Sequence, residues 1–521
     1  MTKNRNYPEY EVPQIKYLCE MILMKSQTQP DDTAFAWFEN SDEKRVTYRE
    51  FAENVMCVSE RLKKEEIRDT NIGLFGDNSY NWLVLFAAVI DSGNIAVALD
   101  KDMMADEISE ILERLDVRIL FADRKNIYKL AGISSSVKIE SLEEVTACKD
   151  VVRTIRFSEP DKDATACIFL TSGTTGTRKG VMLSNDNIAF DINQTCKLFE
   201  VKGVSLAVLP FHHAFGLVAA IWMVFNLGHT IYISQGLRRL QKELVLVKPQ
   251  TLMLVPLFVE NFYKQILINA NSSGRIKKMK VAESAVDLLS HLGIDVRKKM
   301  FKNIIDSFGG ELEFIVSGGA ALDPFYIKQF RRYGIEAING YGTTECSPVA
   351  AVNRNYCHKD GTVGLPISDS NVIVDESGEI LISGRHVMQG YYKEEEETEK
   401  VLQSGIYHTG DLGYVDKDGF LVLTGRKKNL IILSSGENIS PEELEEKLLR
   451  IDDIDEVIVS AEQNHLKATI YSQKNDEDTY DSISSSIEHL NKTLPIYKRI
   501  TSYTFQKEPF KKTTTQKIIR R

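Results

Sequence analysis

The sequence predicts an α/β protein. Its large N-terminal domain is expected to consist of layered α/β sheets with a small β-barrel subdomain, and a small α+β C-terminal domain follows. Apolar, strand-like runs alternate with amphipathic helical runs through most of the chain, which favours largely parallel sheets. From about Gly361 the apolar runs shorten, and turns such as 375–378 and 416–419 follow one another closely. This pattern is typical of an antiparallel or barrel-like subdomain.

The strands and helices of the N-terminal domain follow from this alternation. The runs 71–75 and 95–99 are predicted strands, and the segment 80–90 between them is a predicted helix. Farther along the chain, 314–320 and 335–341 each have the pattern of a buried strand that opens into a glycine-containing loop. Loops at the carboxyl ends of parallel strands are where α/β proteins bind ligands, so we expect the functional site there.

The C-terminal domain begins where this pattern restarts. After Gly425-Arg426-Lys427-Lys428 come a strand, a glycine loop and a helix. The helix is expected to have Ser440 as its N-cap and Pro441 at its first position, with Glu443 completing a capping box. The predicted domains are 1–427, including a β-rich subdomain over about 350–427, and 428–521.

The composition suits a large protein that does not bind nucleic acids. The chain has 521 residues, 43% of them hydrophobic, which is enough for two or more domains. Its 64 Lys and Arg residues against 74 Asp and Glu residues give a formal charge of −10. Such a balance argues against generic affinity for nucleic-acid backbones, so no nucleic-acid partner is expected.

Three further features predict a cytoplasmic protein. The seven cysteines show no CxxC pair and are expected to be free thiols in a reducing compartment. The first residues lack the apolar core of a secretion signal. The longest apolar run, 214–225, is too short to cross a membrane and predicts a buried helix.

The charged runs have a simple interpretation and, in two cases, a sharper one. The run 394–397 is expected to be a solvated helix start. The basic segments 275–280 and 297–302 are first interpreted as solvated helix faces. Alternatively, they form a basic patch for phosphate-bearing partners, such as lipid headgroups, the nucleotide part of coenzyme A or an acidic carrier protein.

The most informative stretch is 171–180 (TSGTTGTRKG), which lies between two predicted strands and has no apolar side chain. Its glycines allow backbone amides to point outward, its hydroxyls add donors, and its two cations add charge, so it could wrap polyphosphate oxygens. It does not match the Walker A spacing, because Lys179 is followed by Gly180. By itself, such a loop could equally be a flexible turn. The residues proposed to bind phosphate are Thr171, Ser172, Gly173, Thr174, Thr175, Gly176, Thr177, Arg178 and Lys179.

This stretch is the first of an ordered series of motifs that resembles the AMP-forming acyl-CoA synthetases of the adenylate-forming superfamily. Luciferases and the adenylation domains of peptide synthetases belong to the same superfamily. The resemblance spans roughly residues 35 to 521 and is closest to the long-chain fatty acid–CoA ligases. The further motifs are 209–216 (LPFHHAFG), 317–322 (SGGAAL), 341–345 (YGTTE), 409–411 (TGD), 425–426 (GR), 434–441 (SSGENISP) and 512–517 (KTTTQK).

The resemblance implies a reaction in two halves. A carboxylic acid, expected to be a fatty acid, attacks the α-phosphate of ATP to give an acyl-adenylate and pyrophosphate; the thiol of coenzyme A then displaces AMP. A near alternative is a fatty acyl-AMP ligase that loads the phosphopantetheine arm of an acyl carrier protein. A luciferase-like oxygenase and a non-catalytic nucleotide-binding protein are less favoured. The implied cofactors are ATP, Mg²⁺ and coenzyme A or the carrier-protein phosphopantetheine.

By the same resemblance, the phosphates and the metal ion have specific partners. Lys179 is the expected cationic contact of the β- and γ-phosphates, unless it is only an exposed loop cation. Glu345, beside Thr344, resembles the Mg²⁺ ligand of the family, with help from the hydroxyl of Thr171. An anionic oxygen suits a hard cation that bridges phosphates. The plainer alternative is that Glu345 caps the segment that follows it.

The adenosine is expected to contact a second group of residues. Tyr341 would supply an aromatic face for adenine, and Asp411 resembles the carboxylate that accepts both ribose hydroxyls. Arg426 would reach the ribose or the α-phosphate, although Asp411 and Arg426 could each form a surface ion pair instead. The other nucleotide-binding residues implied by the motifs are Gly319, Ala320, Ala321, Asn339, Gly340, Gly342, Thr343 and Thr344.

The acyl substrate is expected to lie near the paired histidines. His213 resembles the family histidine beside the substrate carboxylate, with a buried structural histidine as the alternative, while His212 is expected to be such a structural residue. Peptide-synthetase adenylation domains place an Asp near this point to pair with an α-ammonium. Here the sequence has His213 and Ala214, which disfavours an amino-acid substrate. The apolar residues from Phe215 to Trp222 would wall an acyl pocket, or simply pack in the core.

The C-terminal motifs imply a mobile domain. Lys517 matches the catalytic lysine of the family, although Gln516 stands where most members have Gly. Lys428 falls at the family's hinge, and the loop at Gly436 would line the thiol channel after the domain turns. Two partners are left open, an acyl carrier protein and a weak peripheral contact with a membrane. No oligomeric state is predicted.

Overall fold

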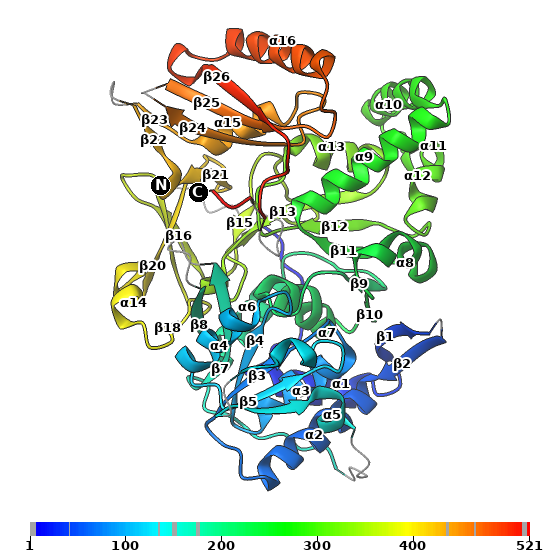
Figure 1. The fold of residues 1–521 in the computed structure, drawn as a ribbon. Coiled ribbons are helices and arrows are strands. Elements are labelled where there is room, and N and C mark those ends of the chain that lie inside the picture. The colour runs from blue at the N-terminus through cyan, green and yellow to red at the C-terminus, as the bar shows by residue number, and fades with distance from the viewer. Residues whose placement is uncertain are drawn as a thin grey trace. The chain divides into compact units, whose positions relative to one another are not determined.

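The computed structural model describes residues 7–40, 42–133, 136–147, 154–172, 178–433, 437–462, 465–512 and 518–520. It has the mixed α/β architecture that the sequence predicts, with layered sheets and a small C-terminal part (Figure 1). The chain forms two compact units. The large unit consists of Met1–Val372 and Ile382–Tyr407, and the small unit of Ile373–Leu381 and His408–Arg521. The boundary proposed at 427/428 stays a prediction.

A seven-stranded sheet forms the first layer of the large unit. Its order is β18-β8-β7-β4-β3-β5-β6, and the strands from β7 to β6 run parallel. Along β4, Ala96 and Ala98 pack in one core while Val97 and Leu99 pack in another, so helices cover both faces. The strands are β3 (Asn71–Phe75), β4 (Ile95–Leu99), β5 (Ile119–Ala122), β6 (Lys138–Ser141), β7 (Thr165–Ser172), β8 (Arg178–Ser184) and β18 (Gly390–Tyr391). The covering helices are α2 (Tyr48–Lys64), α3 (Tyr80–Asp91) and α5 (Leu142–Thr146) on one face, and α4 (Ala105–Arg114) on the other.

A nine-stranded sheet forms the second layer, in the order β15-β14-β13-β12-β11-β9-β10-β1-β2. Its strands are β1 (Thr33–Glu39), β2 (Asp42–Thr47), β9 (Ser205–Ala207), β10 (Ile231–Ile233), β11 (Thr251–Leu254), β12 (Phe314–Ser317), β13 (Glu336–Tyr341), β14 (Ala351–Val352) and β15 (Leu365–Pro366). One core cluster of this layer includes residues of α8 (Leu240–Val247), α9 (Pro256–Ser272), α10 (Ile276–His291), α12 (Lys302–Ser307) and α13 (Pro324–Arg332). The strand and helix predictions at 71–99, 314–320 and 335–341 are thus confirmed.

The apolar run 214–225 is a buried helix, as expected, but most of it has π-helical hydrogen bonding. The π-helix spans Phe215–Met223 and continues as the short α-helix α7 (Val224–Asn226). It packs in the same core as α6 (Asn185–Cys196) and as α1 (Leu18–Thr28). None of the described helices combines the length and the apolar character needed to cross a membrane.

The segment predicted as one barrel-like subdomain contributes to three sheets. β14 and β15 extend the nine-stranded sheet, and β18 joins the seven-stranded sheet. The remaining strands form a five-stranded sheet in the order β16-β17-β20-β19, with β21 paired to β20. They are β16 (Asn371–Val374), β17 (Glu379–Ser383), β19 (Leu402–Gln403), β20 (Ile406–Val415) and β21 (Leu421–Arg426). Two-residue strands that pair with partners far away in the sequence leave no local pattern, which is why the sequence suggested a single subdomain.

The small unit has the predicted α+β character. Its three-stranded sheet has the order β24-β25-β26, and one apolar cluster includes residues of this sheet and of both helices. Its elements after β21 are β22 (Ile431–Ile432), β23 (Asn438–Ile439), α15 (Pro441–Leu448), β24 (Glu456–Glu462), β25 (His465–Tyr471), α16 (Glu477–Thr493) and β26 (Ile500–Gln506).

Two expectations of local detail are wrong. Ser440 is the N-cap residue of α15 and Pro441 is its first residue, but the capping box is absent, because the Ser440 hydroxyl donates to Glu442 at 2.7 Å. Glu443 instead pairs with Lys447 and Lys498. The cysteines are also not all free, since Cys57 is disulfide-bonded. The described free thiols are Cys19, Cys167, Cys196, Cys346 and Cys357.

Candidate functional site

The predicted phosphate loop connects two paired strands at the carboxyl edge of the seven-stranded sheet. β7 ends at Ser172 and β8 begins at Arg178, and the register pairs Thr171 with Lys179 and Ser172 with Arg178. Both ends of the loop are therefore fixed by strand pairing. Its middle, 173–177, lies outside the described residues.

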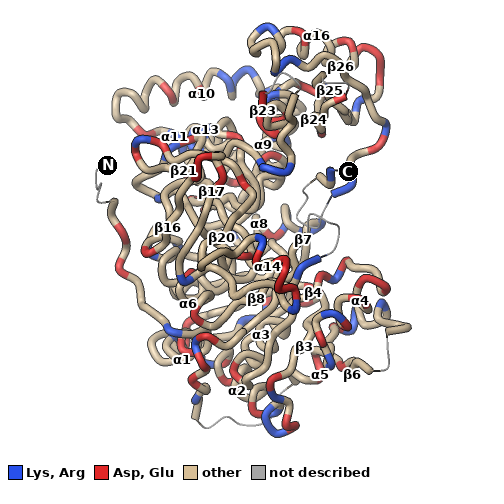
Figure 2. The backbone as a smooth tube through the Cα atoms, turned by 90° about the vertical axis from the view of Figure 1, so that its left-hand side faces the viewer, with Lys and Arg blue, Asp and Glu red and all other residues tan. Residues whose placement is uncertain are grey.

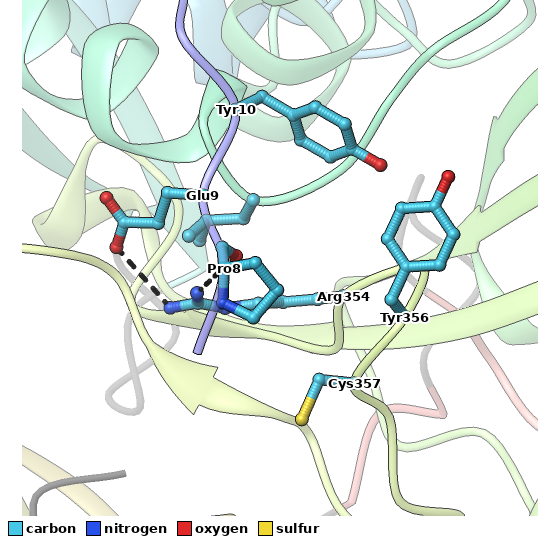
Figure 3. A pocket seen from close by; sticks show the side chains of 7 residues that line it. Pro8, Glu9, Tyr10, Arg354, Tyr356 and Cys357 are labelled. Atoms are coloured by element: carbon cyan, nitrogen blue, oxygen red, sulfur yellow. Dashed lines mark hydrogen bonds and ion pairs between the residues drawn. The ribbon is translucent and has the colours of Figure 1, made fainter. Parts of the chain in front are cut away.

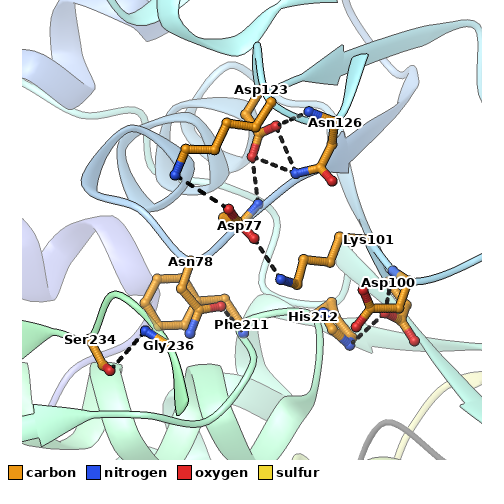
Figure 4. A network of polar contacts seen from close by, with 12 residues as sticks. Asp77, Asn78, Asp100, Lys101, Asp123, Asn126, Phe211, His212, Ser234 and Gly236 are labelled. Atoms are coloured by element: carbon orange, nitrogen blue, oxygen red, sulfur yellow. Dashed lines mark hydrogen bonds and ion pairs between the residues drawn. The ribbon is translucent and has the colours of Figure 1, made fainter. Parts of the chain in front are cut away.

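Three aspartates follow the neighbouring parallel strands at the same edge. Asp100 directly follows β4, Asp123 directly follows β5, and Asp77 comes two residues after the end of β3. A polar network surrounds the three aspartates (Figure 4). Lys101 donates to Asp77 at 2.6 Å, and the backbone N–H of Asp77 donates to Asp123 at 2.6 Å. Because these carboxylates already have partners, this network holds the edge of the sheet in place.

Arg178 is held by acidic side chains of this edge. Its Nε donates to Oε1 of Glu107 at 2.7 Å, and its Nη1 lies 3.4 Å from Oδ2 of Asp100. Asp100 is buried, so its charge remains close to the guanidinium with little screening by water. The structure thus gives Arg178 a role in fixing the start of β8, and the predicted phosphate contact of Arg178 remains a proposal.

Lys179 begins a chain of contacts that leads to Glu345. Its Nζ donates to Oε2 of Glu397 at 2.5 Å and lies 4.6 Å from the centre of the Tyr391 ring. The hydroxyl of Tyr391 donates to Oε1 of Glu345 at 3.0 Å. Tyr391 is paired with Val181 in the β18–β8 register, which brings residues far apart in the sequence to one place. The predicted phosphate lysine and the predicted metal ligand therefore share one neighbour.

Along this series of contacts, one cation, Lys179, lies near two carboxylates, those of Glu397 and Glu345. Hydrogen bonds from Lys179 and Lys400 lower the pKa of Glu397 to about 2. Burial, together with the charge of Glu345 and the hydrogen bond to it, raises the pKa of Tyr391, so its hydroxyl remains a donor. The positive charge of Lys179 is thus balanced by Glu397.

The segment around Glu345 is fixed from several directions. Thr344–Cys346 form a 3₁₀ turn, and the carbonyl of Glu345 accepts from the N–H of Met388 at 2.8 Å. Gly342 packs so closely that a Cβ there would lie 1.8 Å from the carbonyl oxygen of Pro348. Farther on, the N–H of Val349 donates to the buried Asp191 of α6 at 3.2 Å. Only glycine fits at 342, and Asp191 fixes the loop after the metal-ligand candidate.

The donor set here is compatible with a magnesium ion that bridges phosphates. Mg²⁺ is commonly held by one or two carboxylates and by substrate phosphates rather than by a protein cage. Glu345 supplies a carboxylate of which one oxygen accepts from Tyr391, and Thr171 supplies a hydroxyl on the strand next to Lys179. Over the described ranges, no group of three or more His, Cys, Asp or Glu side chains is arranged to hold a metal by itself.

The paired histidines lie on a segment held by Asn78. The side chain of Asn78 donates to the carbonyl of Leu209 at 2.7 Å and accepts from the N–H of Phe211 at 2.9 Å. His212 is buried beside Asp100, 3.5 Å from its carboxylate, and burial lowers the pKa of His212 to about 3. The ring of His213 lies 4.3 Å from that of His212 and is only half-buried. His212 is thus the neutral structural residue that was expected, and His213 is the more accessible of the two.

The predicted adenine segment lies at the ends of β12 and β13. Ser317 and Asn339 are paired in the parallel register, and both are buried. The hydroxyl of Ser317 and the Oδ1 of Asn339 have no hydrogen-bond partner among the described residues. Two neighbouring unpaired polar atoms at a strand end are suited to bind a polar ligand. Tyr341 is 8% exposed, so much of the ring that was expected to face adenine is covered, whereas Ala320 and Ala321 are exposed.

The start of the expected acyl pocket is formed by an aromatic ring against a glycine. A Cβ at Gly318 would lie 2.8 Å from Cζ of Phe215, the first residue of the π-helix. The next residues of that helix are buried in the core. Gly318 thus makes room for Phe215, and the glycine that follows it adopts a left-handed conformation (φ 80°).

The ribose candidates are cross-strand neighbours in the small unit. Asp411 on β20 is paired with Arg426 on β21, and the Arg426 Nε lies 2.9 Å from Oδ1 of Asp411. Asp411 is 6% exposed. Next to them, Lys427 pairs with Glu379 at 2.7 Å, and burial lowers the pKa of Lys428, the predicted hinge residue. Asp411 and Arg426 thus form the ion pair that was considered as their alternative role.

Some predicted positions are not described, and some important residues were not predicted. The loop residues 173–177, Gly436 and Lys517 lie outside the described residues. Tyr391, Asn78 and Asp100 were missed, because single residues give no motif until the fold brings them together. The run 394–397 was expected to be a solvated helix start. Helix α14 (Glu395–Val401) does begin within this run, and Glu397 in its first turn also pairs with Lys179.

A separate pocket lies under the N-terminal segment. Pro8, Glu9 and Tyr10 line it together with Arg354 and Tyr356, and the Arg354 guanidinium donates to the carbonyls of Tyr7 and Pro8 (Figure 3). Its lining contains none of the predicted site residues. The buried Arg354 thus ties down the N-terminal segment.

Two family models match most of this chain. The family model described as AMP-binding enzyme matches residues 24–392, and the model described as AMP-binding enzyme C-terminal domain matches residues 428–521. A long-chain-fatty-acid–CoA ligase (FadD15) of Mycobacterium bovis is 29% identical over 411 residues, which are 72% of this chain and 68% of that protein. The chloroplastic long-chain-fatty-acid–[acyl-carrier-protein] ligase AEE15 of Arabidopsis thaliana is 27% identical over 543 residues, 85% of this chain and 74% of that protein.

A solved structure shows the same fold. The o-succinylbenzoate coenzyme A synthetase of Bacillus subtilis, in complex with ATP and magnesium ion, superimposes with a TM-score of 0.74. The alignment covers 96% of this chain and 98% of that one at 20% identity, a similarity that concerns the fold alone.

Proposed function

The chain belongs to the AMP-binding enzyme family, and from this membership we propose that it is a fatty acid–CoA ligase. In the first half of the proposed reaction, an oxygen of the fatty acid carboxylate forms a bond to the α-phosphorus of ATP. The bond between that phosphorus and its bridge to the β-phosphate breaks, and pyrophosphate leaves. In the second half, the sulfur of coenzyme A bonds to the acyl carbon, and the bond from that carbon to AMP breaks.

The contact chain from Lys179 through Tyr391 to Glu345 is the observation that carries this proposal. It places a cation over the face of one ring and a carboxylate at the hydroxyl of the same ring, and the cation belongs to one of the two strands that bracket the glycine–threonine loop. Lys179 would leave Glu397 for the β- and γ-phosphates as ATP enters. Phosphoryl transfer depends mainly on positioning and charge stabilisation, so fixed groups of this kind are what it requires.

Magnesium would be held by Glu345, with Thr171 beside it and the phosphates of ATP completing its shell. It would supply positive charge against the oxygens of the leaving pyrophosphate. Tyr391 orients Glu345 for this purpose, since its hydroxyl bonds one carboxylate oxygen. Lys517 is proposed to neutralise charge on the carboxylate and the α-phosphate during adenylation.

The acceptor in the second half is proposed to be coenzyme A, with the phosphopantetheine arm of a carrier protein as the second candidate. One similarity supports the second candidate: AEE15, a carrier-protein ligase, aligns with 85% of this chain. Both acceptors present the same thiol, so the chemistry of the acyl-adenylate does not separate them.

Two assays test the proposal. Exchange of labelled pyrophosphate into ATP should require a fatty acid, and failure with every chain length of a broad panel would remove the ligase assignment. AMP release should then be measured with coenzyme A and with a carrier protein as acceptors. If nucleotide turnover yields ADP and orthophosphate instead of AMP and pyrophosphate, the proposed reaction is wrong.

A further inference from the structure

Helix α10 has an apolar outer face that its own unit leaves exposed. Val281, Leu288 and Leu292 are 70%, 66% and 68% exposed. Their spacings of seven and four residues place them on one side of a helix. From Val281 to Leu292 they extend over about 16 Å at 1.5 Å per residue. We call these three residues the α10 apolar line.

Neighbouring elements carry further exposed aliphatic side chains. Ile268 of α9, which packs against α10, is 58% exposed, and Ile294 in the loop after α10 is 50% exposed. Bulky aliphatic side chains scattered singly over a surface need no explanation, but several of them gathered on one face mark an interaction site. The line therefore needs a partner that accepts apolar side chains.

Basic side chains accompany the apolar line at its N-terminal end. Arg275, Lys277, Lys278 and Lys280 are all exposed, and Lys277 precedes Val281 by one helical turn. Figure 2 shows that Lys and Arg gather at one end of α10. These residues belong to the basic segment 275–280, for which a phosphate-bearing partner was one of the two interpretations of the sequence.

The acidic residues of α10 face the other way. Asp287 forms an ion pair with Arg332 of α13 at 2.6 Å, and Glu283 accepts a hydrogen bond from Tyr333 at 3.1 Å. Both carboxylates thus attach α10 to the end of α13, which lies near α10 in Figure 1. The described residues of the outer face, from Lys277 to Leu292, are aliphatic, small, hydroxyl-bearing or basic, with no acidic side chain among them.

We propose that the α10 surface, made of the apolar line and the neighbouring Lys277 and Lys278, docks on a lipid surface that carries anionic headgroups. The helix would lie in the plane of the interface, its aliphatic side chains entering the boundary between headgroups and acyl chains. The lysines would lie among the lipid phosphates, with their stems along the apolar boundary. The whole chain carries a formal charge of −10, so only a local basic surface of this kind would attract it to an anionic membrane.

A lipid surface fits these observations better than an acidic carrier protein does. A row of separate aliphatic side chains on a convex helix has no pocket for a particular side chain, whereas the fluid acyl boundary of a membrane adapts to any such row. The basic residues alone would suit either partner. A carrier protein is therefore the competing outcome of the experiment below.

Vesicle sedimentation with the full-length protein tests the proposal without any catalytic step. We expect binding to vesicles of phosphatidylcholine with phosphatidylglycerol, weaker binding as salt is raised, and little binding to phosphatidylcholine alone. Replacing Lys277→Gln together with Lys278→Gln should weaken partitioning about five-fold for each lysine. The variant V281S/L288S/L292S should weaken it at least ten-fold.

Matched controls and contrary outcomes make the test decisive. The variants Lys44→Gln with Lys64→Gln and Ile432→Ser with Ile496→Ser remove equally exposed residues elsewhere and should bind vesicles as the parent does. Circular dichroism and pyrophosphate exchange should be unchanged in all four variants. Equal binding to neutral vesicles, or no binding at all, would overturn the proposal. So would an acidic carrier protein that binds the parent but not the α10 variants while vesicles bind neither.

Discussion

Lys179 and Glu397 are 218 positions apart in the sequence, yet Nζ of Lys179 lies 2.5 Å from Oε2 of Glu397 in an ion pair. Lys179 is the second residue of β8, directly after the glycine–threonine loop, and Glu397 belongs to the short helix α14 (Glu395–Val401). The pairing of β18 with β8 brings the two segments together. Under the proposed function, this contact holds the loop cation in place until phosphate competes for it.

The competition between Glu397 and ATP predicts the effect of Glu397→Gln. The substitution removes the charge that opposes transfer of Lys179 to the phosphates, so the KM for ATP in pyrophosphate exchange should fall. Exposed ion pairs contribute about 0.2–1 kcal/mol, which sets an upper limit of about five-fold on the decrease. The exposed neighbour Glu396 is the matched control, and Glu396→Gln should leave KM unchanged. An unchanged or higher KM in Glu397→Gln would contradict the competition.

The hydrogen bond from Tyr391 to Glu345 predicts a change in magnesium dependence. Tyr391→Phe keeps the ring against Lys179 but removes the donor to the carboxylate. The loss of about 1 kcal/mol should raise the Mg²⁺ concentration for half-maximal exchange about five-fold. Tyr392→Phe is the control, because the hydroxyl of Tyr392 bonds Asp116 at 2.9 Å instead. Equal magnesium curves for Tyr391→Phe and the parent would argue against Glu345 as the metal ligand.

The Asp411–Arg426 pair predicts how the enzyme discriminates at the ribose. If Asp411 accepts the ribose hydroxyls, the parent should prefer ATP to 2′-deoxy-ATP. In Asp411→Asn, kcat/KM for ATP should fall about 10- to 100-fold, because a hydrogen bond to a charged group is lost. The preference over 2′-deoxy-ATP should disappear with it. A variant that keeps the full preference would show that Asp411 serves only Arg426.

The two halves of the reaction should respond differently to Lys517→Ala. A lysine that acts on the carboxylate and the α-phosphate affects adenylation, so pyrophosphate exchange should fall by orders of magnitude. Thiol transfer from preformed acyl-adenylate should change little. Lys512→Ala is the control, since Lys512 already pairs with Glu456 at 2.6 Å. An equal loss in both halves would refute an adenylation-specific role.

Buried His386 predicts a loss of stability in mild acid. Burial lowers its pKa to about 4 from an ordinary 6.5. Between these values the unfolded chain binds a proton that the folded chain does not, so stability is complete above about pH 6.5 and falls as pH drops. From pH 6.5 to 5 this single group should cost about 2 kcal/mol.

Calorimetry of the parent and of His386→Asn checks this. The variant should lose less stability between pH 6.5 and 5, while the two slopes should agree between pH 7 and 8, where the imidazole is neutral in both states. Identical slopes over the acid range would show that His386 does not contribute.

The elements that the sequence predicted well are those encoded by local patterns. The runs 71–75, 80–90 and 95–99 are continuous and apolar or amphipathic, and each forms the predicted element. The order of the motifs likewise predicted the family, whose two family models match residues 24–392 and 428–521 of this chain. The capping box at Ser440 failed, because Ser440 and Glu443 each found a nearer polar partner.

The sequence by itself thus determined the layered α/β fold, the family and the presence of a glycine–threonine loop between two strands, since all of these depend on contiguous residues. Only the tertiary structure decided that Lys179 faces Glu397, that Tyr391 contacts Glu345, and that Asn78 holds the histidine segment. These contacts join side chains that are far apart along the chain. Strand pairing and burial bring them together, and no local spacing records such an encounter.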